Sequence, residues 1–406
     1  MSWKDIRVGD YLTVLTDYHA NGAYEKLKKN VTLKYEPDYA LMIRTLNFER
    51  GDFKDDLIYL NEEEYEFLAK SKVKPYDIVM NKIANAGSVY LMPNLGQPVS
   101  LAMNLFLLRF DERVDQKFMF YLMKVNEPYI KTFTNGSTTK TITKDAVKNL
   151  NFKLPPLPTQ QKIASILSAY DDLIENNLKR IALLEKSARL LYEEWFVRLR
   201  FPGYEHTKIE NGIPEGWKSQ TAYESMEIMS GGTPKTSNPN FYDGEIPFYT
   251  PKDASDNFYV LETLKTLTEQ GLKNCNSKFY PKDTLFITAR GTVGKLNLAQ
   301  QPMAMNQSCY ALKGKFYITQ KFLYCAMADA VERIKSHAVG SVFDAIVVDT
   351  FKMITLNIPT ENLVNIFEET IRPVFVQTET LLLQTKKLKQ ARNLLLPKLI
   401  NGEIPV

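Results

Sequence analysis

The sequence is poor in the residues on which most metal sites, disulfide frameworks and catalytic triads depend. Of its 406 residues only three are cysteine and three are histidine. Cys275, Cys309 and Cys325 show no CxxC spacing, so we expect neither a zinc site nor a disulfide framework. The histidines are isolated along the chain, which leaves no pattern typical of a metal site or a triad. The sequence therefore predicts no metal ligands.

Long hydrophobic runs and a strong charge bias are absent as well. No apolar stretch approaches the ~20 residues of a membrane span, and the charged start MSWKDIRVGDYLTV carries no signal-peptide core. We therefore expect a cytoplasmic protein that has no membrane partner. The chain has 51 Lys and Arg against 47 Asp and Glu, a net charge of +4. This balance is compatible with a polyanionic partner but does not require one.

Two stretches approach catalytic motifs and depart from them. GTVGKL (291–296) has the glycine and lysine of a phosphate loop without its G-x-x-x-x-G-K-[ST] spacing, and a strand pattern follows it instead of a helix. SNPNF (237–241) is similar to the Asn-Pro-Pro-aromatic signature of amino-methyltransferases, but the second proline is missing. No glycine-rich cofactor loop precedes it. We therefore expect no cofactor and no catalytic residues.

The sequence does contain an internal repeat. Asp145 and Asp349 lie 204 positions apart, and Lys148 matches Lys352 at the same offset. Order and spacing persist over the two halves, although two independent domains with similar endings remain an alternative. The further matches, some across small gaps, are Pro155 with Pro359, Gly136-Ser137 with Gly340-Ser341, Lys117-Phe118 with Lys321-Phe322, Pro75 and Asp77 with Pro281 and Asp283, Met103-Asn104 with Met305-Asn306, and Trp3-Lys4 with Trp217-Lys218.

Each half ends in prolines followed by a long helical pattern. Proline ends a strand and favours a helix start, and Thr159 is the expected N-cap of the first helix. From Ile163 to Trp195 a seam recurs at steps of three and four, with Asn177 at a stutter. The second seam is less apolar, and Pro373 should kink it or delay its start. Helices of ~50 Å cannot be buried in one domain, so we expect them to pair antiparallel, with ordinary domain-packing helices as the alternative.

Short β-rich runs separated by turn residues fill the rest of each half, which predicts mixed domains built on a curved sheet. The expected fold class is α/β (α+β). Two mixed α/β domains, at 1–154 and 201–358, are separated by two long helices, at 155–200 and 359–406. The helices form an antiparallel coiled coil, and the halves are related by a pseudo-two-fold axis.

Polar, basic, amide-rich loops recur in both halves. They are DYHANGAYEKLKKN (17–30), NKIANAG (81–87), TNGSTTKT (134–141), GGTPKTSNPN (231–240) and ARGTVGK (289–295). Arg and Asn suit bidentate base contacts, whereas Lys, Ser and Thr suit phosphates. Ordinary turn chemistry is the alternative. The residues that we expect to contact DNA are Lys82, Asn85, Ser137, Thr138, Lys140, Lys235, Arg290, Thr292, Lys295 and Ser341.

Together these features resemble the DNA-specificity subunit of type I restriction–modification systems. LPPLP (154–158) followed by QQKIA (160–164) is similar to that family's central conserved region, and GIPEGW (212–217) to the start of its second domain. DYHANGAYEKLKKNV, Arg44 and NKIANAGSVYLMPN are similar to one type of first domain. The distal stretch IPTENLVNIFEETIRP departs from the family pattern, because it lacks the Gln-Gln pair and contains Pro373.

The resemblance implies a function for each part. Each half would carry a target-recognition domain that reads one half of a bipartite, asymmetric double-stranded DNA site. The helices would set the spacer and dock two modification (methyltransferase) subunits, and ATP-dependent restriction subunits would join this core. The chain itself would perform no chemistry. Candidate docking residues off the seam, which could instead merely widen the core stripe, are Leu167, Ile174, Leu183, Phe196 and Leu394.

Two other functional classes remain open from the residues alone. A stand-alone DNA methyltransferase or nuclease would need a cofactor loop or an acidic metal cluster, and the sequence contains neither pattern. A coiled-coil scaffold whose end domains bind protein or carbohydrate would not bind random duplex DNA with a steep salt dependence.

Overall fold

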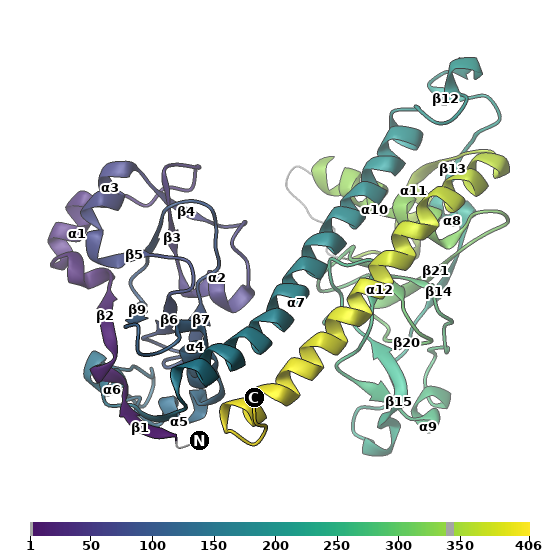
Figure 1. Cartoon of the computed structure of the whole chain (residues 1–406). Helices are drawn as coiled ribbons and strands as arrows, with labels where there is room; N and C mark the ends of the chain where they lie inside the picture. Colours follow the sequence, from purple (N-terminus) through teal and green to yellow (C-terminus); the bar gives the residue numbers. More distant parts are fainter. Residues whose placement is uncertain (1–2, 338–344) are drawn as a thin grey trace. The chain divides into compact units, whose positions relative to one another are not determined.

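The computed structural model describes residues 3–337 and 345–406 (Figure 1). The chain divides into two compact units, unit 1 (Met1–Asp172 with Lys389–Val406) and unit 2 (Leu173–Leu388). The chain therefore passes between the units twice, once within each of its two long helices. In the described part of the chain, none of the helices has the length and hydrophobicity needed to span a membrane.

Unit 1 is built on two four-stranded sheets. The first, antiparallel, has the order β2 (Leu12–Asp17), β9 (Leu105–Phe110), β6 (Ile78–Asn81), β7 (Val89–Leu91). The second has the order β4 (Ile58–Leu60), β3 (Ala40–Ile43), β8 (Val99–Leu101), β5 (Lys72–Val73), with β3 and β8 parallel. Its α-helices are α1 (Tyr24–Asn30), α2 (Thr45–Arg50), α3 (Glu62–Phe67), α4 (Gln116–Val125), α5 (Glu127–Lys131) and α6 (Lys144–Lys148).

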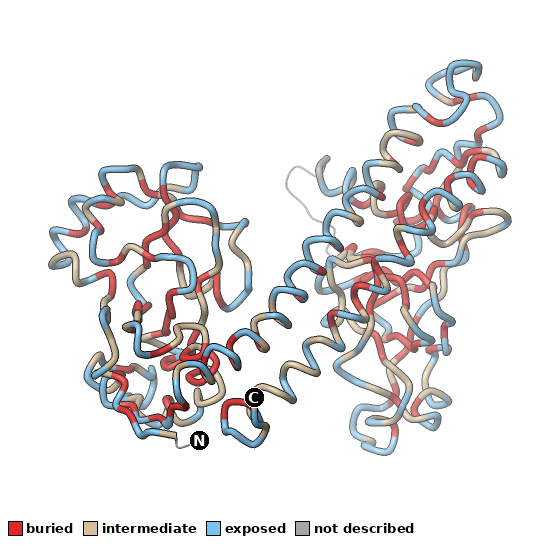
Figure 2. The backbone as a smooth tube through the Cα atoms, in the orientation of Figure 1, coloured by how far each residue is buried: buried red, intermediate tan, exposed pale blue. Residues whose placement is uncertain are grey.

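The strands of the first sheet are apolar on both faces because each face is covered. Phe106 and Leu108 of β9 lie in one hydrophobic cluster with Phe118 of α4. Leu105 and Leu107 alternate with them and belong to another cluster, with residues of the second sheet. Figure 2 shows this buried backbone as red segments. A strand buried on both faces reads as a continuous apolar run, which explains the sequence LFLL.

Unit 2 repeats this plan with its own two sheets. The five-stranded sheet has the order β14 (Met226–Ser230), β21 (Cys309–Gly314), β18 (Leu285–Thr288), β19 (Leu296–Ala299), β16 (Tyr259–Val260). The three-stranded sheet has the order β17 (Thr266–Leu267), β15 (Tyr242–Tyr249), β20 (Ala304–Met305). The hairpin β11 (Ile209–Glu210) and β12 (Ile213–Pro214) precedes them. Its shorter α-helices are α8 (Ala222–Ser225), α9 (Glu269–Lys273), α10 (Gln320–His337) and α11 (Val348–Met353).

One glutamine in each unit shows that the repeat extends to individual hydrogen bonds. Gln116 Oε1 accepts from the Phe110 N–H at 3.0 Å, and its Nε2 donates to the Leu108 carbonyl at 3.1 Å. Gln320 makes the same two bonds with Gly314, at 2.9 Å, and Leu312, at 3.1 Å. Each partner lies 204 positions from its counterpart, so the internal repeat predicted from the sequence is confirmed.

The ends of each domain repeat in the same way. β1 (Lys4–Arg7) pairs antiparallel with β10 (Asn151–Leu154), and β13 (Lys218–Thr221) with β22 (Thr355–Ile358). Lys4 faces Leu154, as Lys218 faces Ile358. The match of Trp3-Lys4 with Trp217-Lys218 is therefore confirmed.

The match of Pro75 and Asp77 with Pro281 and Asp283 is wrong by one residue. In unit 1 the Tyr76 N–H donates to the Met92 carbonyl at 2.8 Å. In unit 2 the equivalent hydrogen bond is made by the Asp283 N–H, which donates to the Ala299 carbonyl at 2.8 Å, so Asp283 corresponds to Tyr76. Both residues have a positive φ, 68° and 63°. Side-chain identity misled the sequence alignment here because the backbone turn, and not the aspartate, is what repeats.

The two long helices are α7 (Leu157–Tyr192), continued by a π-turn (Glu193–Val197), and α12 (Glu361–Ile400). In unit 2 they lie side by side and run antiparallel (Figure 1). The Trp195 and Phe196 rings, at the end of α7, lie 5.6 and 4.9 Å from the Phe367 ring, near the start of α12. The predicted antiparallel pairing is thus confirmed.

Two expectations about the helix starts are wrong. α7 begins at Leu157, so Thr159 lies in its first turn and is not the N-cap. Pro158 fits this first turn because the N–H that proline lacks would have no partner there. α12 begins at Glu361, so Pro373 does not delay it, and the alternative effect, a kink at Pro373, stays a prediction.

Burial raises the pKa of Glu185, on α7, from 4.5 to about 7, although the Phe258 N–H donates to its carboxylate at 2.8 Å. Between these two pH values the folded chain binds more protons at this site than the unfolded chain, so stability should fall as pH rises through this window. We expect Glu185→Gln to raise the unfolding free energy by about 1–3 kcal/mol at pH 8 and to change it little at pH 4. Denaturant titrations followed by tryptophan fluorescence would measure this.

The matched control is Glu175→Gln, because Glu175 is on the same helix with its side chain 61% exposed. This variant should show no such pH-dependent gain. Equal gains in both variants would mean that the gain reflects helix charge and not the burial of Glu185.

Candidate functional site

In unit 1 two of the predicted polar loops lie side by side. The Ala84 N–H donates to the Lys140 carbonyl at 2.9 Å, and the Ile142 N–H donates to the Lys82 carbonyl at 3.0 Å. Ile83 and Thr141 form a bridge between the loops. Backbone hydrogen bonds therefore join loop 81–87 to loop 134–141, and they bring the five predicted unit 1 residues into one region.

The end of strand β2 contributes Asp17, whose carboxylate forms an ion pair with Lys82. The Lys82 Nζ lies 2.7 Å from the Asp17 carboxylate, and the Lys144 Nζ lies 3.0 Å from it. Burial opposes ionisation of Asp17, but the two ammonium groups outweigh it and lower its pKa below 3.8. Lys82 is only 15% exposed, so its charge is shared with a buried carboxylate. Sequence reasoning missed Asp17 and Lys144, because the pairing joins positions far apart in the chain.

The other unit 1 candidates lie closer to solvent. Ser137, Thr138 and Lys140 are exposed. Asn85 accepts a hydrogen bond from the Lys131 Nζ at 3.0 Å, so a lysine outside the predicted set already orients this amide. The exposed loop 134–141 is thus the part of the site most open to a ligand.

In unit 2 loops 231–240 and 289–295 both contact the segment 305–308. The Gly232 N–H donates to the Met305 carbonyl at 3.2 Å, and the Ala289 N–H donates to the Ser308 carbonyl at 2.7 Å. Gly232 has no room for a side chain, because a Cβ would lie 2.6 Å from the Asn276 nitrogen. The two predicted loops therefore belong to one region here as well.

Some of the predicted unit 2 side chains are exposed, whereas others already make a hydrogen bond or an ion pair within the chain. Lys235 and Arg290 are exposed. Thr292 donates its hydroxyl hydrogen to the Pro251 carbonyl at 3.1 Å, and Lys295 pairs with Asp256. Ser341 lies outside the described residues.

The hairpin loops 81–88 and 288–295 share one backbone conformation. The Gly87 N–H donates to the Asn81 carbonyl at 2.9 Å, and the Gly294 N–H donates to the Thr288 carbonyl at 2.8 Å. Both glycines have a positive φ, 86° and 77°, which favours glycine over residues with a side chain. This frame makes Asn85 and Thr292 equivalent, whereas Lys82 corresponds to Ala289. The same loop thus displays different side chains in the two units.

Comparison with known proteins agrees with this duplicated plan. A family model described as the type I restriction modification DNA specificity domain matches residues 2–186 and, separately, residues 214–368. The chain belongs to this DNA specificity family. The resemblance inferred from the sequence is therefore confirmed at the level of the family.

Alignments with individual relatives cover most of this chain. The type I restriction enzyme HindI specificity subunit of Haemophilus influenzae is 24% identical over 404 residues, 83% of this chain and 88% of the relative. The MjaIX specificity subunit of Methanocaldococcus jannaschii is 25% identical over 303 residues, 72% of this chain and 70% of the relative. The crystal structure of a type I S subunit from M. genitalium shares the fold, with 19% identity, a TM-score of 0.60 and coverage of 98% and 96%.

The five candidate docking residues of this specificity-family chain divide into two sets. Leu167, Ile174 and Phe196 are buried and have little surface to offer a partner. Leu183 and Leu394 are 67% and 69% exposed. Leu190 is 42% exposed and follows Leu183 by seven residues, so the two lie on nearly the same face of α7. Val197, 49% exposed, lies in the π-turn that continues the helix. We call Leu183, Leu190 and Val197 the α7 stripe.

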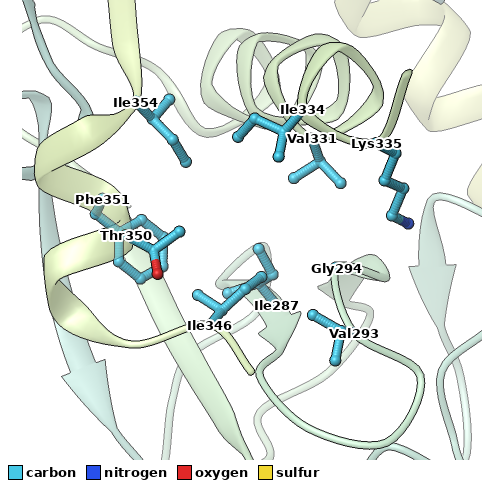
Figure 3. Close-up of a pocket in the computed structure, with 10 residues that line it drawn as sticks. All are labelled: Ile287, Val293, Gly294, Val331, Ile334, Lys335, Ile346, Thr350, Phe351 and Ile354. Carbon is cyan, nitrogen blue, oxygen red and sulfur yellow. The ribbon is translucent and has the colours of Figure 1, made fainter. Parts of the chain in front are cut away.

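The cavity in Figure 3 lies in unit 2, beneath α10. Ile287, Ile334, Ile346 and Phe351 line it, and its volume of about 30 Å³ matches roughly one water molecule. A wider pocket of about 380 Å³, with Glu185, Arg189 and Asp256 in its wall, opens beside α7. Within residues 3–337 and 345–406 no group of three or more His, Cys, Asp and Glu side chains could hold a metal ion.

Proposed function

We propose that this chain is the DNA-reading subunit of a type I restriction–modification complex. Each target-recognition domain, at 1–154 and 201–358, reads one half of a bipartite, asymmetric site in double-stranded DNA. The observation that carries the proposal is the shared frame of loops 81–88 and 288–295. A constant backbone that carries different side chains can present two different sets of contacts to the same kind of ligand.

The chemistry of the exposed loop side chains supports this division of labour. Arg290 can bind a guanine edge through two hydrogen bonds, whereas Lys140, Lys235, Ser137 and Thr138 suit phosphate oxygens. Phosphate contacts supply affinity that is independent of sequence, and base contacts supply the choice. Two readers in one chain also gain affinity, because the second contact becomes intramolecular.

The long helices α7 and α12, which lie within the segments 155–200 and 359–406, set the distance between the readers and dock two modification subunits. The α7 stripe and Leu394 are the docking residues that this proposal favours, because they are exposed. ATP-dependent restriction subunits join the complex, which acts on DNA in the cytoplasm. The chain performs no chemistry itself and positions the catalytic subunits on their target.

Arg290→Ala and Lys140→Ala should weaken DNA binding in different ways. Loss of Arg290 should cost about 1–3 kcal/mol and relax one base pair in one half-site. Loss of Lys140 should weaken binding to all duplexes alike and lower the salt slope by about one. Binding titrations on point-mutated duplexes, together with sequencing of methylated bases in cells, would measure both effects.

Lys153→Ala is the control, because Lys153 is exposed on β10 outside the loops. It should leave affinity and the methylated sequence unchanged. If Arg290→Ala and Lys140→Ala behave like this control, the loops do not read DNA.

A further inference from the structure

One lysine in each unit occupies the same place in the repeated frame. Lys131 ends α5 and Lys335 lies near the end of α10. They are 204 positions apart, which is the offset that relates Gln116 to Gln320 at the start of the same helical region. Neither lysine belongs to the polar loops identified from the sequence.

Both lysine stems lie against the hairpin loop that carries the candidate site residues. A Cβ on Gly87 would lie 3.4 Å from Lys131 Cγ, and one on Gly294 would lie 3.4 Å from Lys335 Cε. Figure 3 shows the Lys335 side chain extending toward the Gly294 loop. The absence of a side chain at each glycine lets the lysine approach the loop backbone closely.

The surroundings of the two lysines differ although the lysines repeat. The Lys131 Nζ donates to Asn85 Oδ1 at 3.0 Å and lies 3.7 Å from the Glu127 carboxylate. The position equivalent to Glu127 is Val331, which offers no carboxylate. Among the described residues Lys335 is exposed and has no ion-pair partner. A shared ion-pair partner therefore does not account for a lysine at both positions.

We propose that Lys131 and Lys335 each bind a DNA phosphate beside the hairpin loop of its domain. The two half-sites differ in bases, but the sugar–phosphate backbone is common to both, so a repeated cation next to unlike loop side chains fits the common part of the ligand. This inference rests on the proposed function. The competing explanation is that the two stems only cover the glycine backbone.

Methionine substitution separates these explanations, because methionine keeps an unbranched apolar stem and removes the charge. We expect the full chain with Lys131→Met and Lys335→Met to bind duplex DNA with a salt slope that is smaller in magnitude by about 1.8, or ~0.9 for each lost phosphate contact. The loss should be equal for unrelated duplexes. Lys131→Arg with Lys335→Arg should restore the slope, since arginine keeps the charge.

The control pair is Lys179→Met with Lys208→Met, both 70% exposed and outside the hairpin loops. It should keep the wild-type slope. If the wild type binds duplexes with a steep slope and Lys131→Met with Lys335→Met keeps it, this inference is overturned and the proposed function stands. A wild type without salt-dependent duplex binding overturns both.

Discussion

Lengthening both long helices by four residues should lengthen the unread gap in the methylated DNA site by one or two base pairs. The insertions belong between Asp172 and Leu173 and between Leu388 and Lys389, where the chain crosses from one unit to the other. Four helical residues add about 6 Å, and base pairs in DNA are ~3.4 Å apart. They also add only ~40° beyond a full turn, so the helix seam should nearly survive.

The insertions are placed at the unit boundary so that they change the helix length without disturbing a hydrophobic core. Ile181 is 1% exposed in the unit 2 core, so an insertion there would disturb packing, whereas the unit boundary avoids that cluster. The methylated sequence in cells that also express the modification subunits would be the measurement. Both half-sites should stay unchanged, because no reading loop is altered.

A four-residue insertion at Asn211-Gly212 is the control. This dipeptide forms the exposed turn between β11 and β12, with φ values of 51° and 79°, and it lies outside both helices. The gap should not change in this variant. An unchanged gap in the helix variant as well would refute the spacer role, and altered half-sites would mean that the helices themselves read DNA.

Leu183→Glu with Leu190→Glu should abolish co-purification with the modification subunit. Burying a leucine is worth ~1.5–3 kcal/mol, and every 1.4 kcal/mol is tenfold in affinity. Losing two such contacts and placing two carboxylates in the interface should weaken association by at least ~100-fold. Quantitative pull-down against purified modification subunit would measure the loss.

Phe316→Glu supplies the matched control for that experiment. Phe316 is 92% exposed in the turn before α10. In this control an exposed apolar side chain is again replaced by glutamate, but away from the long helices. Association should persist in this variant. If the α7 stripe variant also keeps wild-type association and the same unfolding transition, the stripe is not the docking surface.

The two long helices and the internal repeat were predictable because both depend on the spacing of residues along the sequence. Seams at steps of three and four gave the two long helices, and a constant offset gave the repeat. The side of a helix that meets its own domain was not predictable, since periodicity cannot show what packs there. For this reason Leu167 and Phe196, proposed as docking residues, turned out to be buried in the hydrophobic cores.

The candidate site was predictable only in part, for a related reason. Loop composition identified the exposed Lys140 and Arg290. It could not show that Lys82 shares its charge with Asp17, because that ion pair joins a loop residue to the end of the distant strand β2. Nor could it show which loop positions correspond, since Asn85 and Thr292 become equivalent only through the hydrogen bonds of the hairpin frame.

The paired strands at the ends of each domain make that domain an exchangeable cassette. The chain enters the first domain on β1 and leaves it on β10, and the two strands are hydrogen-bonded neighbours. β13 and β22 do the same for the second domain. Strands in a ladder lie only ~4.8 Å apart, so the point of insertion is almost the same on the way in and on the way out. Under the proposed function, recombination at these strands would replace one target-recognition domain and leave both long helices and the other domain intact.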